Sequence, residues 1–178
     1  RLVDDLLTIS AIELGEKKLT FEAVSVKSVI ENVVSLIELR AEEKGITIEK
    51  NFADDLGPVR GDRDSLGQIL LNILDNAVKF TPEGGTVSIT ASGVDEDIAI
   101  RIEDTGIGIP ENEISRLGER FYRVDKMRSR GMGGTGLGLS IVKHLMDAHR
   151  GKVKIQSQLG RGTTVTLFLP RMREHGAA

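Results

Sequence analysis

Residues 97–110 read DIAIRIEDTGIGIP, an alternating apolar stretch that runs into a glycine turn. Ile98, Ile100 and Ile102 occupy every second position, which places their side chains on one face of a β-strand. Asp104 is the next residue in the same phase, so the buried row ends in a carboxylate. Since an unpaired buried carboxylate is costly, this pattern favours a site with a polar partner. The alternative is an ordinary turn-forming Asp before glycine.

A second strand precedes this one and is predicted to pair with it. Val87, Ile89 and Ala91 alternate in the same way, and residues 93–97 supply the turn of an antiparallel hairpin. Apolar periodicity and end signals predict extended segments at 19–24 and 46–52, helices at 26–45, 62–80 and about 136–151, a short helical piece at 111–121, and strands around 153–155 and 165–169. This order favours an α+β fold, a two-layer α/β sandwich in which three main helices cover a mixed, mostly antiparallel sheet of about five strands.

The ends of the helices have recognisable signals. Ser25 and Asp62 are good N-caps for the first two long helices, and Gly151 is expected to close the third. The apolar positions of the first long helix include Leu36 and Leu39. We expect these two leucines to face the core with the rest of that helix's apolar stripe.

The chain opens with a further amphipathic helix. Leu2, Leu6 and Ile9 are spaced by four and three residues, which is typical of a seam between packed helices. The helix is already in phase at Arg1 and has no cap, so we expect the tail of a longer helix. The predicted division is a helix end with a hinge at 1–17, a globular domain at 18–171 and a tail at 172–178.

The composition argues against several classes of protein. The absence of Cys excludes a disulfide scaffold, a zinc ribbon and a thiol nucleophile, and three His make a metal site built on imidazoles unfavourable. A net charge of −3 does not point to nucleic acid or to a membrane surface, so any anion binding must be local. No apolar run approaches the ~20 residues of a bilayer span and no signal peptide opens the chain, so we expect a soluble segment.

Glycine is concentrated in one region, since eight of the twenty lie between Gly106 and Gly138. Residues 131–138 read GMGGTGLG and open the third long helix, where backbone N–H groups and the helix dipole form a ready anion site. A literal G-x-G-x-x-G is present, but it is not preceded by the apolar strand of a Rossmann dinucleotide-binding unit. The separate P-loop pattern, which ends G-K-[ST], is absent. Four basic residues lie immediately upstream: Arg123, Lys126, Arg128 and Arg130. Their positive charge would suit a polyphosphate, although a basic loop is usually only solvated.

The helix at 62–80 has a polar stripe beside its buried face. Asn72, Asn76 and Lys79 lie within about 60° of arc on a helical wheel, and Phe80 adjoins them. Asn oxygens can ligate magnesium, Lys can meet phosphate, and a Phe ring can pack on a flat base. The alternative is a solvated helix margin. Two Asn on one stripe count against it, because Asn is a mediocre residue inside a helix.

Five segments, in order, resemble the ATP-binding domain of bacterial sensor histidine kinases. They match its N box, first glycine box, F box, second glycine box and third glycine element: NILDNAVKFT (72–81), DTGIGIP (104–110), ERFYRVD (119–125), GGTGLGL (133–139) and GRGT (160–163). The resemblance covers essentially all of residues 19–170. The opening helix, which begins RLVDDLL, is similar to the end of the second helix of the dimerisation and phosphotransfer domain in such kinases.

The resemblance implies a Bergerat ATP-binding fold, with ATP as substrate and Mg²⁺ as cofactor. Asp104 would accept a hydrogen bond from the exocyclic amine of adenine, Asn76 would coordinate Mg²⁺, and Phe80 would pack near the base. Residues 107–135 would form a mobile lid over the nucleotide.

The same resemblance assigns roles residue by residue. The residues expected to take part in catalysis at the phosphate end are Asn72, Lys79 and Arg123. The expected nucleotide-binding residues are Asn72, Asn76, Lys79, Phe80, Asp104, Gly106, Ile107, Gly108, Ile109, Phe121, Tyr122, Arg123, Gly134, Thr135, Gly136, Leu137, Gly138, Leu139 and Thr163, and Asn76 is the expected metal ligand.

Three departures from the wider family matter. In related gyrases, heat-shock chaperones and mismatch-repair ATPases, a Glu one turn before the magnesium Asn activates water. Asn72 stands there instead, which favours phosphoryl transfer over hydrolysis. No segment resembles the H box with its acceptor histidine, so we expect His144, His149 and His175 to be structural or exposed and the chain not to phosphorylate itself. Gly118 stands where the F box usually has Phe, so we expect looser packing of the lid.

The resemblance thus implies a domain that donates the γ-phosphoryl group of Mg-ATP to a histidine on a phosphotransfer domain not present in this chain. The phosphoryl group would pass on to a response-regulator aspartate. The parent would be a homodimer acting in the cytoplasm, whether or not it is membrane-anchored, with no nucleic-acid partner. Two alternatives stay open: a regulatory ATP-binding module without phosphotransfer, and, less favoured, a Bergerat-fold ATPase.

Overall fold

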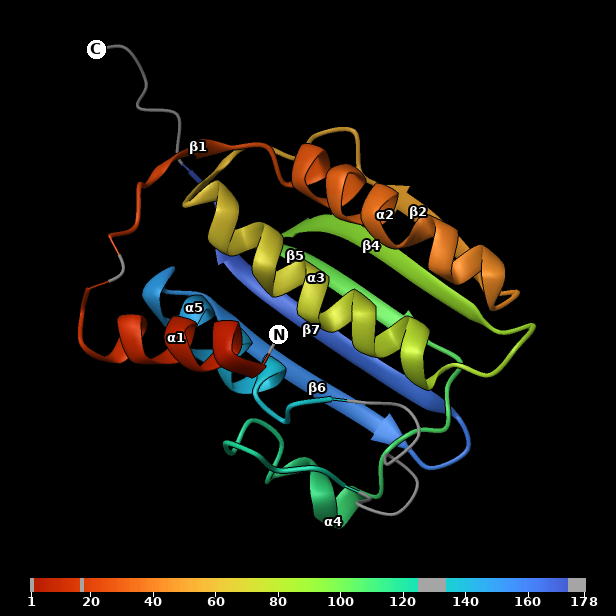
Figure 1. Cartoon of the computed structure of the whole chain (residues 1–178). Coiled ribbons are helices and arrows are strands. Elements are labelled where there is room, and N and C mark those ends of the chain that lie inside the picture. Colours follow the sequence, from red (N-terminus) through yellow and green to blue (C-terminus); the bar gives the residue numbers. More distant parts are fainter. Residues whose placement is uncertain (1, 17, 125–133, 173–178) are drawn as a thin grey trace, which may run out of the picture.

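A five-stranded mixed sheet forms one layer of the computed structural model, which describes residues 2–16, 18–124 and 134–172 (Figure 1). The strands are β2 (Thr47–Phe52), β4 (Thr86–Val94), β5 (Asp97–Asp104), β6 (Lys152–Gln158) and β7 (Gly162–Pro170). Their order across the sheet is β2-β4-β5-β7-β6. β2 runs parallel to β4, and the other pairings in this sheet are antiparallel, which confirms a mixed, mostly antiparallel sheet.

Three helices form the second layer and cover one face of the sheet (Figure 1). They are α2 (Val26–Glu43), α3 (Arg63–Phe80) and α5 (Gly138–Ala148). Ser25 and Asp62 cap α2 and α3 as predicted, because their side-chain oxygens accept hydrogen bonds from the amides of Ser28 (3.3 Å) and Ser65 (2.8 Å). The predicted two-layer α+β sandwich is therefore confirmed.

The core lies between these layers and is almost entirely aliphatic. Ile98, Ile100 and Ile102 of β5 are at most 1% exposed, and the predicted row of β4 is buried beside them. The helices contribute facing residues that include Ile69, Ile73, Leu74, Ile141 and Leu145. Burying a side chain of this size stabilises the fold by about 1.5–3 kcal/mol. A slip of one residue would expose the whole row, so burial sets the register and the face on which Asp104 lies.

Two features of the helical layer and its surroundings differ from the sequence-based expectation. β1 (Glu22–Val24) pairs antiparallel with β3 (Val59–Gly61) in a separate small sheet. β3 was not expected, because three residues are too few to show a period. Leu36 and Leu39 of α2, expected in the core, are 69% and 66% exposed. The buried stripe of this helix instead includes Val33 and Ile37.

The end of α5 also differs in detail. The residue with left-handed backbone after this helix is Arg150 (φ 55°), and not Gly151. Gly151 is required for another reason, because a Cβ on it would lie 2.7 Å from the carbonyl oxygen of Phe168 in β7. The helix itself begins at Gly138, two residues later than predicted.

Two further helices lie outside the sandwich (Figure 1): α4 (Glu111–Ile114), a single turn within the segment predicted to be helical at 111–121, and α1 (Leu2–Glu13), which packs on α5. Ile9 is 3% exposed in this contact, whereas Leu6, predicted on the same seam, is 39% exposed. Val3 and Leu7 are 65% and 64% exposed. None of the described helices combines the length and the hydropathy that a bilayer crossing needs.

Candidate functional site

The motif segments converge where α3 ends, where α5 begins and just beyond the end of β5. The side-chain amide of Asn72 donates to the carbonyl oxygen of Gly138 at 3.3 Å, which joins α3 to the start of α5. The amide of Ile107, in the turn after β5, donates to the carbonyl oxygen of Phe80 at 3.2 Å. These two hydrogen bonds bring the N box into contact with the first glycine box and with the end of the second, although the three segments are far apart in the sequence.

Asp104 is the last residue of β5, and its carboxylate is held by backbone amides. Oδ1 accepts hydrogen bonds from the amides of Gly106 (2.8 Å) and Thr163 (3.2 Å). In the described part of the chain no donor reaches Oδ2. The expected polar partners of this carboxylate are thus two backbone amides, which both donate to Oδ1. Oδ2 is available to a ligand.

The electrostatics of Asp104 reflect its partial burial. Burial raises the pKa of this carboxyl above its ordinary value of 3.8, the amides of Gly106 and Thr163 oppose the shift, and the charge of Glu103 adds to it. A partly desolvated carboxylate is a strong acceptor for a ligand N–H, because water competes with that hydrogen bond less effectively.

The turn after Asp104 depends on glycine. Gly108 has φ +68°, and a Cβ on it would collide with the carbonyl oxygen of Gln158. The loop is tied to β6 and to the turn after it: the amide of Ile109 donates to Ser157 Oγ at 2.8 Å, and that of Gly160 donates to the carbonyl oxygen of Ile107 at 2.7 Å. The first glycine box is therefore a tight, hydrogen-bonded turn beside Asp104.

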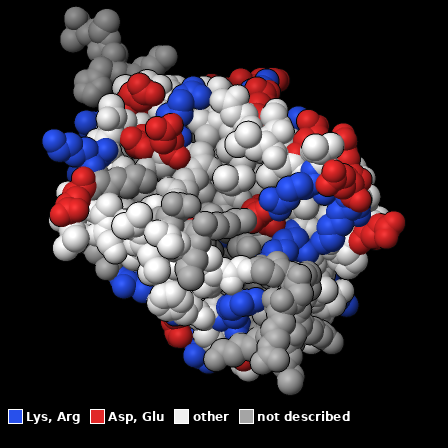
Figure 2. Space-filling view, in the orientation of Figure 1, with Lys and Arg blue, Asp and Glu red and all other residues white. Residues whose placement is uncertain are grey.

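The polar stripe of α3 faces the same region. Asn76 is exposed, and Lys79 and Phe80 are half-buried, with Nζ of Lys79 lying 4.8 Å from the centroid of the Phe80 ring. Lys79 also approaches the second glycine box, because a Cβ on Gly134 would lie 2.7 Å from its Nζ. Figure 2 shows Lys and Arg side chains gathered over the C-terminal ends of α2 and α3, which gives an otherwise acidic protein a local basic area.

Asn76 fits the role of a magnesium ligand. Its exposed side chain offers one amide oxygen, and Mg²⁺ commonly takes one or two protein oxygens together with waters and substrate phosphates. Among the described residues no group of three or more His, Cys, Asp or Glu is arranged to hold a metal ion. A metal held here would therefore depend on a nucleotide for most of its ligands.

The segment between the glycine boxes is partly described. The amide of Phe121 donates to the carbonyl oxygen of Gly136 at 3.1 Å, so the F box meets the second glycine box. The Tyr122 ring is covered by the guanidinium of Arg116, 4.0 Å from its centroid, and Arg123 is half-buried. Lys126, Arg128 and Arg130 lie outside the described residues.

Gly118, the residue that stands where the F box usually has Phe, has close neighbours in the structure. The aliphatic chain of Lys143 in α5 lies against this glycine, and its Nζ donates to the carbonyl oxygen of Leu117. Gly118 has φ +91°, which a side chain would strain. A lysine from the adjacent helix therefore packs on this glycine.

The start of α5 makes a contact that the sequence did not predict. Thr135 Oγ1 donates to Asp5 Oδ2 of α1 at 2.8 Å and accepts from the amide of Leu137 at 3.2 Å. Leu137 is fully buried and Leu139 is half-buried, so neither presents its whole side chain to a ligand. No local pattern could reveal a partner 130 residues away.

The histidines that the structure describes have structural partners, as expected. His149 is 4% exposed, accepts from the amide of Asp62 at Nε2 (3.0 Å) and pairs through Nδ1 with the carbonyl oxygen of Leu145 (2.6 Å). His144 Nδ1 pairs with the carbonyl oxygen of Ser140 at 2.8 Å. His175 lies outside the described residues.

Comparison with known proteins identifies the family. Residues 61–173 match the model of the histidine kinase-, DNA gyrase B- and HSP90-like ATPases. The chain is 38% identical over 176 residues to the sensor histidine kinase WalK of Bacillus subtilis, covering 98% of this chain and 29% of WalK. It is 38% identical over 169 residues to the sensor-like histidine kinase SenX3 of Mycolicibacterium smegmatis, covering 95% of this chain and 44% of SenX3.

Solved structures of histidine kinases are also similar to this chain. Full-length ShkA, crystallised in complex with AMPPNP, superposes with a TM-score of 0.84 at 35% identity, covering 95% of this chain and 35% of ShkA. The mycobacterial sensor histidine kinase MprB gives a TM-score of 0.74 at 32% identity, covering 86% of this chain and all of that one. The chain spans less than half the length of WalK and SenX3. It belongs to the histidine kinase-, DNA gyrase B- and HSP90-like ATPase family, as a catalytic ATP-binding domain of the sensor histidine kinase type.

Proposed function

We propose that this domain binds Mg-ATP and donates its γ-phosphoryl group to a histidine on a phosphotransfer domain. α1 would be the end of that domain's second helix, residues 18–171 the catalytic domain, and 172–178 a tail. In the parent kinase, a homodimer acting in the cytoplasm, the phosphoryl group would pass to a response-regulator aspartate. The observation that carries the proposal is the carboxylate of Asp104, fixed on one oxygen and available on the other.

Adenine recognition follows from that geometry. Gly106 and Thr163 hold Oδ1, so Oδ2 of Asp104 can accept from an exocyclic amine in a fixed direction. Phe80 and Ile107 are joined by a hydrogen bond between their backbones, close to the Asp104 carboxylate. Their apolar side chains would offer contact to a flat base. A purine with a carbonyl in place of the amine would place one acceptor against another.

The phosphate end would lie between α3 and the start of α5. Lys79 would contribute an ammonium, Arg123 a guanidinium, and the α5 N-terminus backbone donors with the positive end of its dipole. Asn76 would hold Mg²⁺, which when bound neutralises charge on the phosphates. These residues act by positioning and charge, the dominant means of catalysis in phosphoryl transfer.

Asn72 favours transfer over hydrolysis. Its amide is engaged with the carbonyl oxygen of Gly138, and an amide cannot take a proton from water. An acceptor imidazole needs no such base, because its nitrogen attacks with a lone pair. The new P–N bond forms as the bond from the γ-phosphorus to the β,γ-bridging oxygen breaks, and ADP leaves.

The test is a phosphotransfer assay in trans. This chain would be mixed with γ-labelled Mg-ATP and a separately prepared phosphotransfer domain, and acid-labile, base-stable label on that domain would be measured. We expect label with the wild-type chain and, at an ATP concentration near the wild-type dissociation constant, at least about tenfold less with Asp104→Asn. Nucleotide binding without label on any cognate domain would favour a regulatory module, and phosphate release without an acceptor would favour an ATPase.

A further inference from the structure

The last turn of α3 carries both Lys79 and Phe80, so its conformation sets the direction of two proposed ligand contacts. The final four carbonyls of any α-helix have no partner within the helix and need donors from elsewhere. In α3 these carbonyls belong to Ala77, Val78, Lys79 and Phe80.

Two of the four are satisfied by the segments that follow α3 and β5. The carbonyl oxygen of Ala77 accepts from the amide and the hydroxyl of Thr81, at 3.0 and 2.7 Å. The carbonyl oxygen of Phe80 accepts from the amide of Ile107 at 3.2 Å. The first glycine box therefore rests on the last residue of α3.

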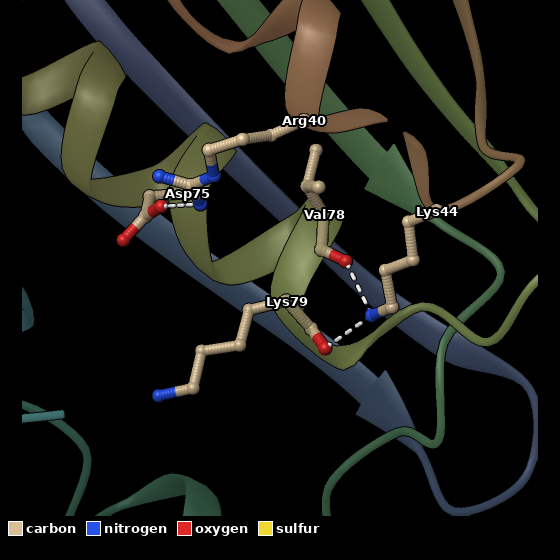
Figure 3. A network of polar contacts seen from close by, with 5 residues as sticks. All are labelled: Arg40, Lys44, Asp75, Val78 and Lys79. Atoms are coloured by element: carbon tan, nitrogen blue, oxygen red, sulfur yellow. Dashed lines mark hydrogen bonds and ion pairs between the residues drawn. The ribbon is translucent and has the colours of Figure 1, made fainter. Parts of the chain in front are cut away.

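The other two are satisfied by one side chain from a different helix. Nζ of Lys44, the C-cap residue of α2, donates to the carbonyl oxygens of Val78 (2.8 Å) and Lys79 (2.6 Å). Figure 3 shows Lys44 reaching the back of this turn while the side chain of Lys79 points away from it. The ammonium also lies at the negative end of the α3 dipole, where a cation is favoured.

The surroundings of Lys44 suit a fixed contact. Lys44 is half-buried, and burial lowers the pKa of its side-chain amine. An amine keeps donor hydrogens in either protonation state, so both carbonyls stay satisfied. One turn earlier on α2, Arg40 pairs with the buried carboxylate of Asp75, also on α3. At the other end of the pair, Arg63 of α3 donates to Ser28 Oγ of α2 at 3.5 Å. Of these three contacts, only that of Lys44 reaches the last turn of α3.

We infer that Lys44 is a positioning residue for the nucleotide site, which holds the last turn of α3 so that Lys79 and Phe80 face the ligand. It touches no proposed ligand group itself. The inference rests on the proposed function, because it needs a nucleotide to be bound at this site. Without Lys44, two carbonyls would turn toward water and the turn would fray, so binding would have to order it again.

The experiment compares four proteins by calorimetry with Mg-ATP, thermal unfolding and amide hydrogen exchange. Lys44→Met keeps the aliphatic stem and removes the donors. Lys44→Arg restores donors, and Arg40→Met breaks the neighbouring ion pair between α2 and α3 without touching the last turn. Lys50→Met, on the exposed edge of β2, controls for the loss of one positive charge.

We expect Lys44→Met to weaken Mg-ATP binding about fivefold, the scale of a lost helix cap, and to speed exchange of the Ile107 amide. Lys44→Arg should recover most of the affinity. Arg40→Met should lower the unfolding temperature at least as much as Lys44→Met and leave the affinity within about twofold. Lys50→Met should behave as wild type.

If Lys44→Met bound Mg-ATP as tightly as the wild type, the inference would be overturned and the proposed function would stand. The same would follow if Arg40→Met lost as much affinity for Mg-ATP as Lys44→Met. A loss in Lys44→Arg as large as that in Lys44→Met would also contradict a carbonyl-capping role. If the wild-type chain itself failed to bind Mg-ATP, both the proposed function and the inference would fall. If Arg40→Met does not fold, the comparison of Lys44→Met with Lys44→Arg still decides whether the donors of Lys44 are needed for binding.

Discussion

At the scale of single residues, Asp104 shows how a site can oppose stability. Its carboxylate ends a buried row of β5, and two backbone amides compensate only part of the desolvation. The raised pKa means that the folded state holds the Asp104 proton more tightly than the unfolded chain does. The contribution of this group to stability is therefore greatest in acid, below its ordinary pKa of 3.8. It falls as the pH rises through the raised folded value.

Asp104→Asn should separate binding from stability. The amide oxygen can still accept from Gly106 and Thr163, whereas the NH₂ group would point a donor at the adenine amine. We expect ATP affinity to fall by about 1.5–3 kcal/mol, while the unfolding temperature at pH 7 rises. The temperature difference should shrink as the pH falls through the raised pKa of the folded wild-type carboxyl toward its ordinary value of 3.8, because the wild-type side chain then becomes neutral as well. Glu49→Gln, on the exposed edge of β2, is the control for the loss of one negative charge. An Asp104→Asn protein with unchanged affinity would refute the adenine contact.

Asn76 makes a different prediction, because it is exposed and contributes little to the fold. Asn76→Ala should change the free energy of unfolding by no more than about 0.5 kcal/mol. Phosphotransfer in magnesium should be abolished, and binding of adenosine, which has no phosphates, should not change. Thermal unfolding, the trans assay and calorimetry check the three parts. Full activity in Asn76→Ala would remove its role as a metal ligand.

At the scale of elements, α1 and α5 connect the beginning of the chain to the nucleotide site. Ile9 is buried against the domain, and the carboxylate of Asp5 is held by the hydroxyl of Thr135, just before α5. The same helix end is the proposed site for phosphates, so a carboxylate and a triphosphate would lie near each other. The docked position of α1 is therefore expected to disfavour the nucleotide.

Asp5→Asn should tighten Mg-ATP binding about two- to fivefold, because one like charge beside the phosphates is removed. The affinity for adenosine should not change. Asp147→Asn, near the opposite end of α5, is the matched control and should have no effect on either ligand. An equal gain for adenosine, or no gain for Mg-ATP, would contradict an electrostatic effect at this helix end.

The elements that could be predicted from sequence are those with long local patterns. Periodicity and caps located α2, α3 and the β4–β5 hairpin, whereas the roles that the motifs give to Asp104 and Asn76 stay predictions. β3 was missed because it is three residues long, and Leu36 was misplaced because apolar residues also occur on exposed faces. The Lys44 cap was missed because it joins residues that only the tertiary fold brings together.

At the scale of the whole molecule, one sheet and one helical layer bring together motifs that are spread over residues 72–163. The antiparallel pairing of β5 with β7 sets Asp104 opposite Thr163, and the packing of α3 beside α5 sets Asn72 beside Gly138. The ordinary aliphatic core thus holds the polar groups in place, and the unusual residues are those that face the site. Function at this scale depends on whether the assembled groups select an adenine nucleotide.

Calorimetric titration of the wild-type chain with Mg-ATP and with Mg-ITP addresses this selection directly, since the two nucleotides differ at the amine that Asp104 should accept from. ATP should bind at least about tenfold more tightly than ITP, because the inosine carbonyl would face the Asp104 carboxylate. Asp104→Asn should abolish or reverse this preference, because the NH₂ group of Asn can donate to the inosine carbonyl and not to the adenine amine. Equal binding of ATP and ITP by the wild-type chain would contradict an adenine site built on Asp104.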